Sequence, residues 1–187
     1  MCHYITATSS GNARLEAIAA LLDRHALGFE RIDNPHVRGQ LRPGDVQVST
    51  TRKMCDCGTM LASRSRPEVE ERTLEREVRK LRAKGWSEAL IERWLAEKAM
   101  AADRAVRERG SMADGHEPEV ERWLAVISEA LNAGYARRFG LLVHWYSGGL
   151  ESERLQLGPT QSVPLSELSA TTLLEMREDA LLEIRSD

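Results

Sequence analysis

The alternation of apolar and polar residues predicts several short strands in this chain. Residues 2–8 are rich in β-prone side chains and stop at a Ser/Gly/Asn turn cluster. Residues 46–51 alternate apolar and polar positions behind a Pro-Gly turn, and residues 141–147 form an almost continuous apolar and aromatic run. Such a run is typical of a central strand covered on both faces. Weaker patterns predict strands at residues 29–33 and 154–157, the latter as an antiparallel partner of the central run.

Apolar residues recur at helical spacing in three other segments. One helix is predicted from Asn12, its N-cap, to about residue 26, and another from Glu117 to Gly134. Residues 169–184 show the same spacing and predict a final amphipathic helix.

Residues 66–109 predict a helical hairpin inserted between the strands. Ser65 and Glu68 match a capping box that opens its first helix, Gly85 ends that helix, and Ser87 is a good N-cap for the second.

Two aromatic residues of this hairpin, Trp86 and Trp94, lie among many charged side chains. Aromatic residues at helical spacing are commonly core, but one face of the hairpin can also bind a protein partner or a second copy of the chain. Homodimerisation through residues 66–109 is therefore a hypothesis.

Together these segments predict a single α+β domain over residues 1–187, in which helices pack a small, mainly antiparallel sheet and residues 66–109 form an insertion. A chain of 187 residues is long enough to close a core without disulfides. Its hydrophobic content of 42% and charged content of 29% are ordinary for a globular protein.

The formal net charge of −3 gives no strong signal for a nucleic-acid partner. Residues 1–66 are mildly basic, with nine Lys/Arg against six Asp/Glu, which favours an anionic ligand only if those arginines are more than solvated surface. No apolar run approaches the ~18 residues that a membrane span needs, and residues 1–8 lack the pattern of a secretory signal. We therefore expect a cytoplasmic protein, in which cysteines are ligands, nucleophiles or packed thiols.

The three cysteines fall in two short stretches, Met1-Cys2-His3-Tyr4 and Met54-Cys55-Asp56-Cys57. If residues 2–8 pair antiparallel with residues 46–51, the start of one strand lies beside the end of the other. In extended backbone Cys55 and Cys57 also share a face, since side chains alternate with a period of two. We therefore predict that Cys2, Cys55 and Cys57 meet.

Three thiolates form a soft ligand set that suits Zn(II), with Zn–S distances near ~2.3 Å. A fourth ligand is predicted to be His3, His144, Asp56 or water, although strand alternation turns His3 away from Cys2. Gly58 after Cys57 is typical of metal knuckles, in which a residue without Cβ lets backbone N–H groups approach sulfur. The first hypothesis is thus a metal-binding protein with Cys2, Cys55, Cys57 and His3 as candidate zinc ligands.

Two other interpretations stay open. Loss of Met1 would leave Cys2 at the N-terminus as a nucleophile, with its α-amino group, His3 or His144 as base. This opening resembles that of N-terminal-cysteine amidotransferases and of abasic-site-crosslinking proteins. Those families continue with Gly where this chain has His3, so no further roles are transferred. In the third interpretation, the thiols only fill the core of a protein-interaction module.

Overall fold

The structure is a computed structural model that describes residues 2–64, 78–97 and 117–187. The chain divides into two compact units. The first combines Met1–Ser65 with Pro118–Asp187, and the second is Arg66–Glu117. Each is described separately below.

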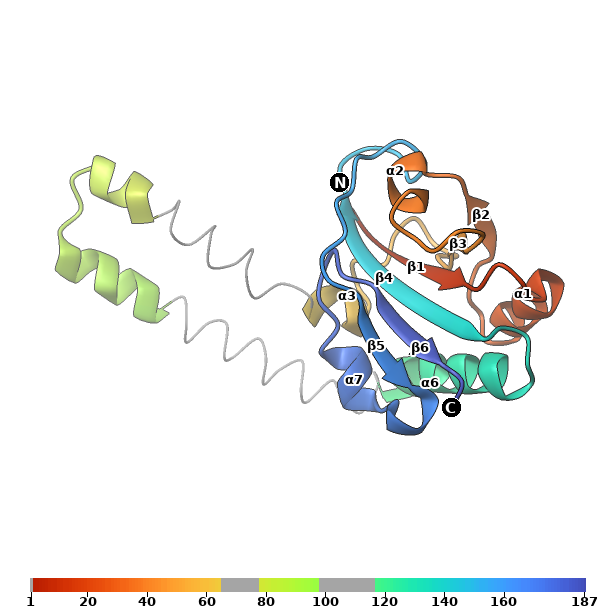
Figure 1. Cartoon of the computed structure of the whole chain (residues 1–187). Coiled ribbons are helices and arrows are strands. Elements are labelled where there is room, and N and C mark those ends of the chain that lie inside the picture. The colour runs from red at the N-terminus through yellow and green to blue at the C-terminus, as the bar shows by residue number, and fades with distance from the viewer. Residues whose placement is uncertain (1, 65–77, 98–116) are drawn as a thin grey trace. The chain divides into compact units, whose positions relative to one another are not determined.

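The first unit is built on a six-stranded sheet in the order β2-β3-β1-β4-β6-β5 (Figure 1). All of its strand pairs are antiparallel except β5 with β6, so the predicted α+β class with a mainly antiparallel sheet is confirmed. The strands are β1 (Cys2–Ser9), β2 (Glu30–Ile32), β3 (Val46–Ser49), β4 (Arg138–Tyr146), β5 (Gln161–Pro164) and β6 (Leu182–Arg185). The helices are α1 (Leu15–Arg24), α2 (Pro35–Arg38), α3 (Met60–Arg64), α6 (Glu117–Asn132) and α7 (Ala170–Leu174), with a short 3₁₀ turn, η2 (Leu165–Glu167).

β1 lies between β3 and β4, and both pairings agree with the sequence pattern. Thr6 is opposite Ser49 of β3, which confirms the antiparallel pairing predicted for residues 2–8 and 46–51. On its other side β1 pairs with β4 along its whole length, from Cys2 opposite Tyr146 to Ser9 opposite Phe139. The apolar run at residues 141–147 is therefore a central strand, as predicted.

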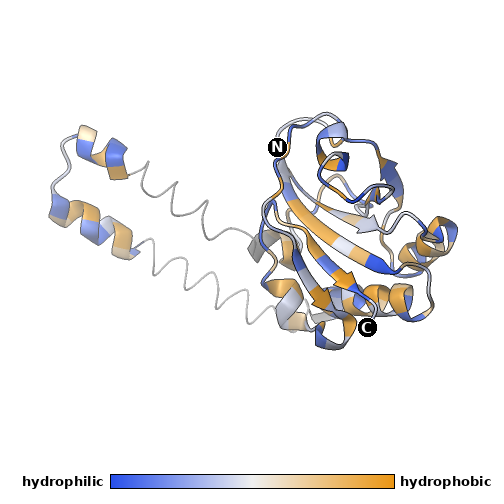
Figure 2. Ribbon diagram, viewed as in Figure 1, coloured by the Kyte–Doolittle hydropathy of each residue, from blue (hydrophilic) through white to orange (hydrophobic). Residues whose placement is uncertain are grey.

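The two faces of the sheet carry different cores. Alternate residues of β1 and β4, such as Ile5 and Val143, pack with the apolar faces of α1 and α6 in the main core. Figure 2 shows the corresponding apolar residues along β4 and α6. The opposite face is closed by a smaller group around Leu142. Its other buried members are Val37 of α2, Leu155 and Leu181.

The strand predicted at residues 154–157 is wrong. This segment has no strand conformation. The Gln40 side chain hydrogen-bonds the backbone of this segment instead. The Gln40 Nε2 amide donates to the Leu155 carbonyl at 2.7 Å, and Gln40 Oε1 accepts the Leu157 N–H at 2.8 Å. Leu155 then points into the smaller core.

The final helix predicted over residues 169–184 is also wrong. Ser169 caps a helix by accepting the Thr172 N–H at 3.2 Å, but this helix, α7, ends at Leu174. The last apolar residues, Leu182 and Ile184, instead alternate along β6, where both are buried. A period of two over four residues is easily mistaken for part of a helical pattern.

The first helix is confirmed, but its predicted cap is wrong. The N-cap position of α1 is Arg14, which makes no side-chain capping hydrogen bond, and Asn12 lies in the preceding turn. A tertiary contact sets this start, since the Arg14 N–H donates to the Tyr135 carbonyl at 2.7 Å.

The second unit is described over residues 78–97. Residues 78–83 and 88–97 are helical, and Gly85 between them has a φ of 81°. Ser87 Oγ lies 3.4 Å from the Leu90 N–H, at the start of the second segment. The rest of the predicted hairpin, in residues 66–77 and 98–109, lies outside the described residues, so the hairpin and its partner surface stay predictions. Within the described ranges, no helix has the length and apolarity needed to cross a membrane.

Candidate metal centre

The structure brings the three cysteines together at the start of β1. The Sγ atoms of Cys2, Cys55 and Cys57 all lie within 4.8 Å of one another, a grouping that can hold a metal ion. All three are free thiols, with Cys57 exposed and the other two partly exposed. We call this group the thiol trio.

The backbone route to the thiol trio differs from the extended one predicted. β3 ends at Ser49, and residues 52–54 and 56–59 form bends and turns. The chain then returns to the edge of β1, where the Asp56 N–H donates to the His3 carbonyl at 2.9 Å. Cys55 and Cys57 flank this returning residue, so the contact between Asp56 and β1 places both thiols beside Cys2.

Asp56 anchors the loop with its side chain as well. Its Oδ2 accepts the Ile5 N–H at 2.8 Å and the Thr51 hydroxyl. Burial raises the pKa of Asp56 above its ordinary value, and the hydrogen bonds from Thr51 and Ile5 offset only part of this effect. Asp56 was a candidate ligand, but its carboxylate is already engaged in holding the loop.

Two further contacts fix the ends of the loop. The Tyr4 hydroxyl donates to the Met54 carbonyl at 2.8 Å, just before the first loop cysteine. After the second, the Thr59 hydroxyl donates to the Asp56 carbonyl and also accepts the Ala62 N–H of α3 at 3.3 Å. The loop is therefore tied to β1 on one side and to a helix start on the other.

The thiols differ in acidity. The Cys57 N–H, the Cys57 thiol and the Cys2 thiol all hydrogen-bond to the Cys55 sulfur and lower the pKa of Cys55. The pKa of Cys2 is raised, mainly because its thiol donates to Cys55 and secondarily by burial. At a given pH below 9, Cys55 therefore has the larger thiolate fraction and Cys2 the smaller one.

Gly58 does not have the role that the knuckle pattern predicted. A Cβ at this position would meet no heavy atom within 4 Å, and its φ is outside the left-handed region. The N–H···S contact to Cys57 comes instead from His3, whose backbone nitrogen lies 3.2 Å from Cys57 Sγ.

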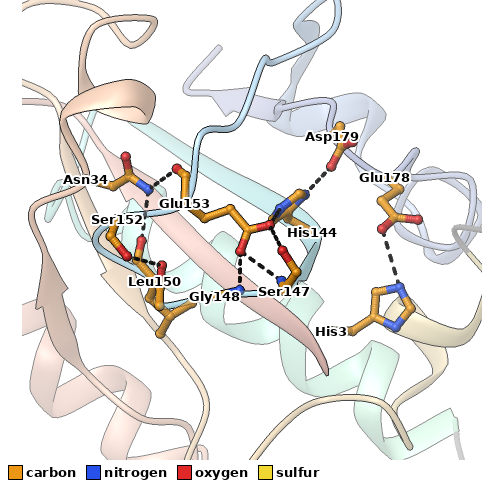
Figure 3. Close-up of polar contacts among 11 residues, drawn as sticks. His3, Asn34, His144, Ser147, Gly148, Leu150, Ser152, Glu153, Glu178 and Asp179 are labelled. Carbon is orange, nitrogen blue, oxygen red and sulfur yellow. Dashed lines mark hydrogen bonds and ion pairs between the residues drawn. The ribbon is translucent and has the colours of Figure 1, made fainter. Parts of the chain in front are cut away.

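The imidazoles of His3 and His144 have other partners. His3 Nε2 lies 3.5 Å from Glu178 Oε1, and the ring packs edge-on against Trp145. His144 shares the Cys2 face of the β1–β4 ladder, but its Nδ1 lies 2.5 Å from Asp179 Oδ1 (Figure 3). No pattern in the sequence pointed to Glu178 or Asp179, because each becomes recognisable only once the fold brings it to a histidine.

Comparisons of this chain with protein-family models, with curated proteins and with solved structures find no match. The function of the chain is therefore inferred from its residues and their geometry.

Proposed function

We propose that this chain is a cytoplasmic zinc-binding protein whose ion is held by the thiolates of Cys2, Cys55 and Cys57. The observation that carries the proposal is the convergence of three Sγ atoms within 4.8 Å from two distant stretches. Sulfur atoms around a tetrahedral Zn(II) are separated by roughly 3.8 Å, given Zn–S bonds of ~2.3 Å. The thiol trio therefore needs to contract by no more than about 1 Å to hold zinc.

Exposure and second-sphere contacts support a ligand role over simple packing. Cysteines that only fill a core are buried, whereas Cys57 is exposed and the other two are partly so. The His3 N–H donates to Cys57 Sγ, a contact that stabilises a thiolate. A reducing compartment, which we infer for this protein, keeps such thiols free to bind metal.

The fourth coordination position is open to water or to an exogenous ligand in this proposal. Among the described residues, the candidate group contains only the three thiols. The Asp56 carboxylate accepts hydrogen bonds from Ile5 and Thr51, and the His3 imidazole contacts Glu178. His3 can become the fourth ligand only by leaving Glu178 and turning toward the other face of the sheet. A zinc ion with one open position is able to polarise a bound water.

Elemental analysis of the full chain, purified without chelator and supplied with zinc, tests this proposal. We expect one zinc per wild-type chain and none in Cys57→Ser. His36→Ala is the matched control, because His36 is an exposed imidazole far from the motif in sequence that would bind only adventitious zinc. A zinc-free wild type, or a Cys57→Ser variant with normal zinc and a native circular dichroism spectrum, would contradict the proposal.

A reactive thiol is the second candidate, and the pKa difference favours Cys55 over Cys2 for this role. In metal-free protein below pH 9, alkylation by iodoacetamide is expected at Cys55 before Cys2, because the lowered pKa gives Cys55 the larger thiolate fraction. Peptide mass mapping at short reaction times gives the order. Faster labelling of Cys2 would favour the N-terminal-nucleophile hypothesis over a reactive Cys55.

A further inference from the structure

A second group of ligand side chains lies at the free edge of β4. β6 pairs only with Arg138–Leu141, so the end of β4 extends past it. The segment that precedes β6 follows this free edge, and the Asp179 N–H donates to the Val143 carbonyl at 3.0 Å. Two adjacent acidic residues of this segment contact different histidines. Asp179 contacts His144, and Glu178 contacts His3 (Figure 3).

Three of these side chains form a compact donor set. One ligand atom each from His144, Glu178 and Asp179 lies within 4.8 Å of the others. An imidazole nitrogen with two carboxylate oxygens suits divalent first-row cations such as Mn(II) and Fe(II), which are harder than the Zn(II) proposed for the thiol trio.

The surroundings of His144 match those of a metal-ligating histidine. Such a histidine usually directs its second ring nitrogen at a carboxylate, which orients the ring. With Nδ1 at Asp179, the His144 Nε2 faces Glu153 Oε1 at 3.7 Å. Glu153 is itself held by the Ser147 N–H, the Ser147 hydroxyl and the Gly148 N–H, at 2.6 to 2.8 Å.

The charges around this histidine favour a cation. Among the described residues, the ion pairs of Asp179 and Glu153 both go to His144, and one imidazole supplies at most one positive charge. Its Nε2 is buried and has no hydrogen-bond partner within the described part of the chain. The His144 side chain is 11% exposed and that of Asp179 is 45% exposed. The imidazole of the donor set is therefore mostly buried, whereas the Asp179 carboxylate is accessible to solvent.

We propose that His144, Glu178 and Asp179 form a second metal site, for a divalent first-row cation, with Glu153 and His3 as supporting residues. This site lies across the β1–β4 ladder from the thiol trio and shares no ligand with it. Metal binding at this site does not require zinc binding by the cysteines.

Titration with Mn(II) of the full chain loaded with one equivalent of zinc, followed by the electron paramagnetic resonance signal of free Mn(II), tests the site, because the single zinc equivalent fills the thiol trio and leaves this site open. Mn(II) does not displace zinc from thiolates, because zinc binds such ligands far more tightly. We expect one Mn(II) per wild-type chain and loss of uptake in Asp179→Asn. Asparagine is the best replacement, because residue 179 has a φ of 62° and Asn tolerates this left-handed backbone.

Two further variants sharpen the result. Glu153→Gln is expected to weaken Mn(II) binding by about 10- to 100-fold, the usual effect of removing a supporting carboxylate. Asp33→Asn is the control, since Asp33 is an exposed carboxylate whose ion pair among the described residues is with Arg38, and its loss should leave uptake unchanged. A wild-type chain that takes up no Mn(II) overturns the proposal, as does a folded Asp179→Asn variant that binds like wild type.

Discussion

Two loops of this molecule are each folded around one carboxylate, and the two carboxylates behave in opposite ways. Asp56 holds the loop of the thiol trio, and burial raises its pKa despite two hydrogen bonds. Burial also acts on Glu153, but the hydrogen bonds from Gly148 and Ser147, together with nearby His144, hold the pKa of Glu153 below its ordinary value. Burial outweighs the two hydrogen bonds at Asp56, whereas the additional donor and the nearby histidine outweigh burial at Glu153.

The difference separates two kinds of metal chemistry. The Asp56 carboxylate is engaged by the Ile5 N–H and the Thr51 hydroxyl, so the soft thiolates are left as the ligands of the thiol trio. The Glu153 carboxylate beside His144 accepts two backbone N–H donors and faces the imidazole, which favours its ionised form, and the ligand set itself consists of the oxygen and nitrogen donors that harder cations need. One molecule thus presents a soft donor set at the β1 edge and a borderline one at the β4 edge of the same strand pair.

The strongest test of this separation is whether a variant in each site loses one metal and still binds the other. Cys57→Ser is expected to lower zinc affinity by more than about 100-fold, because losing a ligand costs more than losing a supporting residue. Its Mn(II) uptake should be normal. His144→Ala should lose Mn(II) uptake and retain the zinc affinity of wild type. Zinc competition with a chromophoric chelator and Mn(II) resonance, measured on both variants, check the prediction. Coupled loss of both metals in either folded variant would mean that the two sites are one.

The anchoring role of Asp56 gives the next largest effect. Asp56→Ala leaves the buried Ile5 N–H without its acceptor and should lower the free energy of unfolding by about 2–3 kcal/mol. Asp56→Asn retains an acceptor oxygen and removes the cost of burying a charge, so its loss should stay below about 1 kcal/mol. Urea unfolding of the metal-free proteins measures both. Equal losses in the two variants would show that the charge of Asp56, rather than its hydrogen bonds, holds the loop.

The thiol trio could be predicted from the sequence because it depends on one strand pairing. Both strands have clear patterns, and an antiparallel ladder between them necessarily places the start of β1 beside the chain that leaves β3. What the pattern missed is how Cys55 and Cys57 converge. Their placement comes from the side chain of Asp56 at the edge of β1, a tertiary contact that no local spacing encodes.

The second group could not be predicted for a related reason. His144 and Asp179 are 35 positions apart, and they meet only because β6 pairs with β4 and leaves the end of β4 free. The sequence pattern predicted a helix over residues 169–184 in place of β6, so the contact between His144 and Asp179 was not foreseen. A four-residue strand such as β6 has too few residues for its period to be distinguished from that of a helix.

Acid titration tests the lowered pKa of Glu153. Because its folded-state pKa is below the ordinary value of 4.5, ionised Glu153 stabilises the fold above pH 4.5, and this contribution is lost as the pH falls through the folded-state pKa. Glu153→Gln should therefore cost on the order of 1 kcal/mol at pH 7 and progressively less in acid. Unfolding curves of metal-free wild type and variant at several pH values give the difference. A constant difference down to the acid limit would count against the ionised form as the stabilising one.

Tyr146 offers the smallest and most selective change, because it lies between the two sites. It is opposite Cys2 in the β1–β4 register, and its ring packs edge-on against His144 at 4.4 Å between centroids. Burial raises its pKa to about 12, so the neutral phenol stabilises the fold, and this contribution is lost as the pH rises from the ordinary value of 10.0 through 12. The hydroxyl interacts with the Gln47 side chain, and the loss of this one contact in Tyr146→Phe should change stability at pH 7 by less than about 1 kcal/mol. The variant should also lose the alkaline destabilisation of wild type while retaining both metals. Loss of either metal in Tyr146→Phe would show that this phenol couples the two sites.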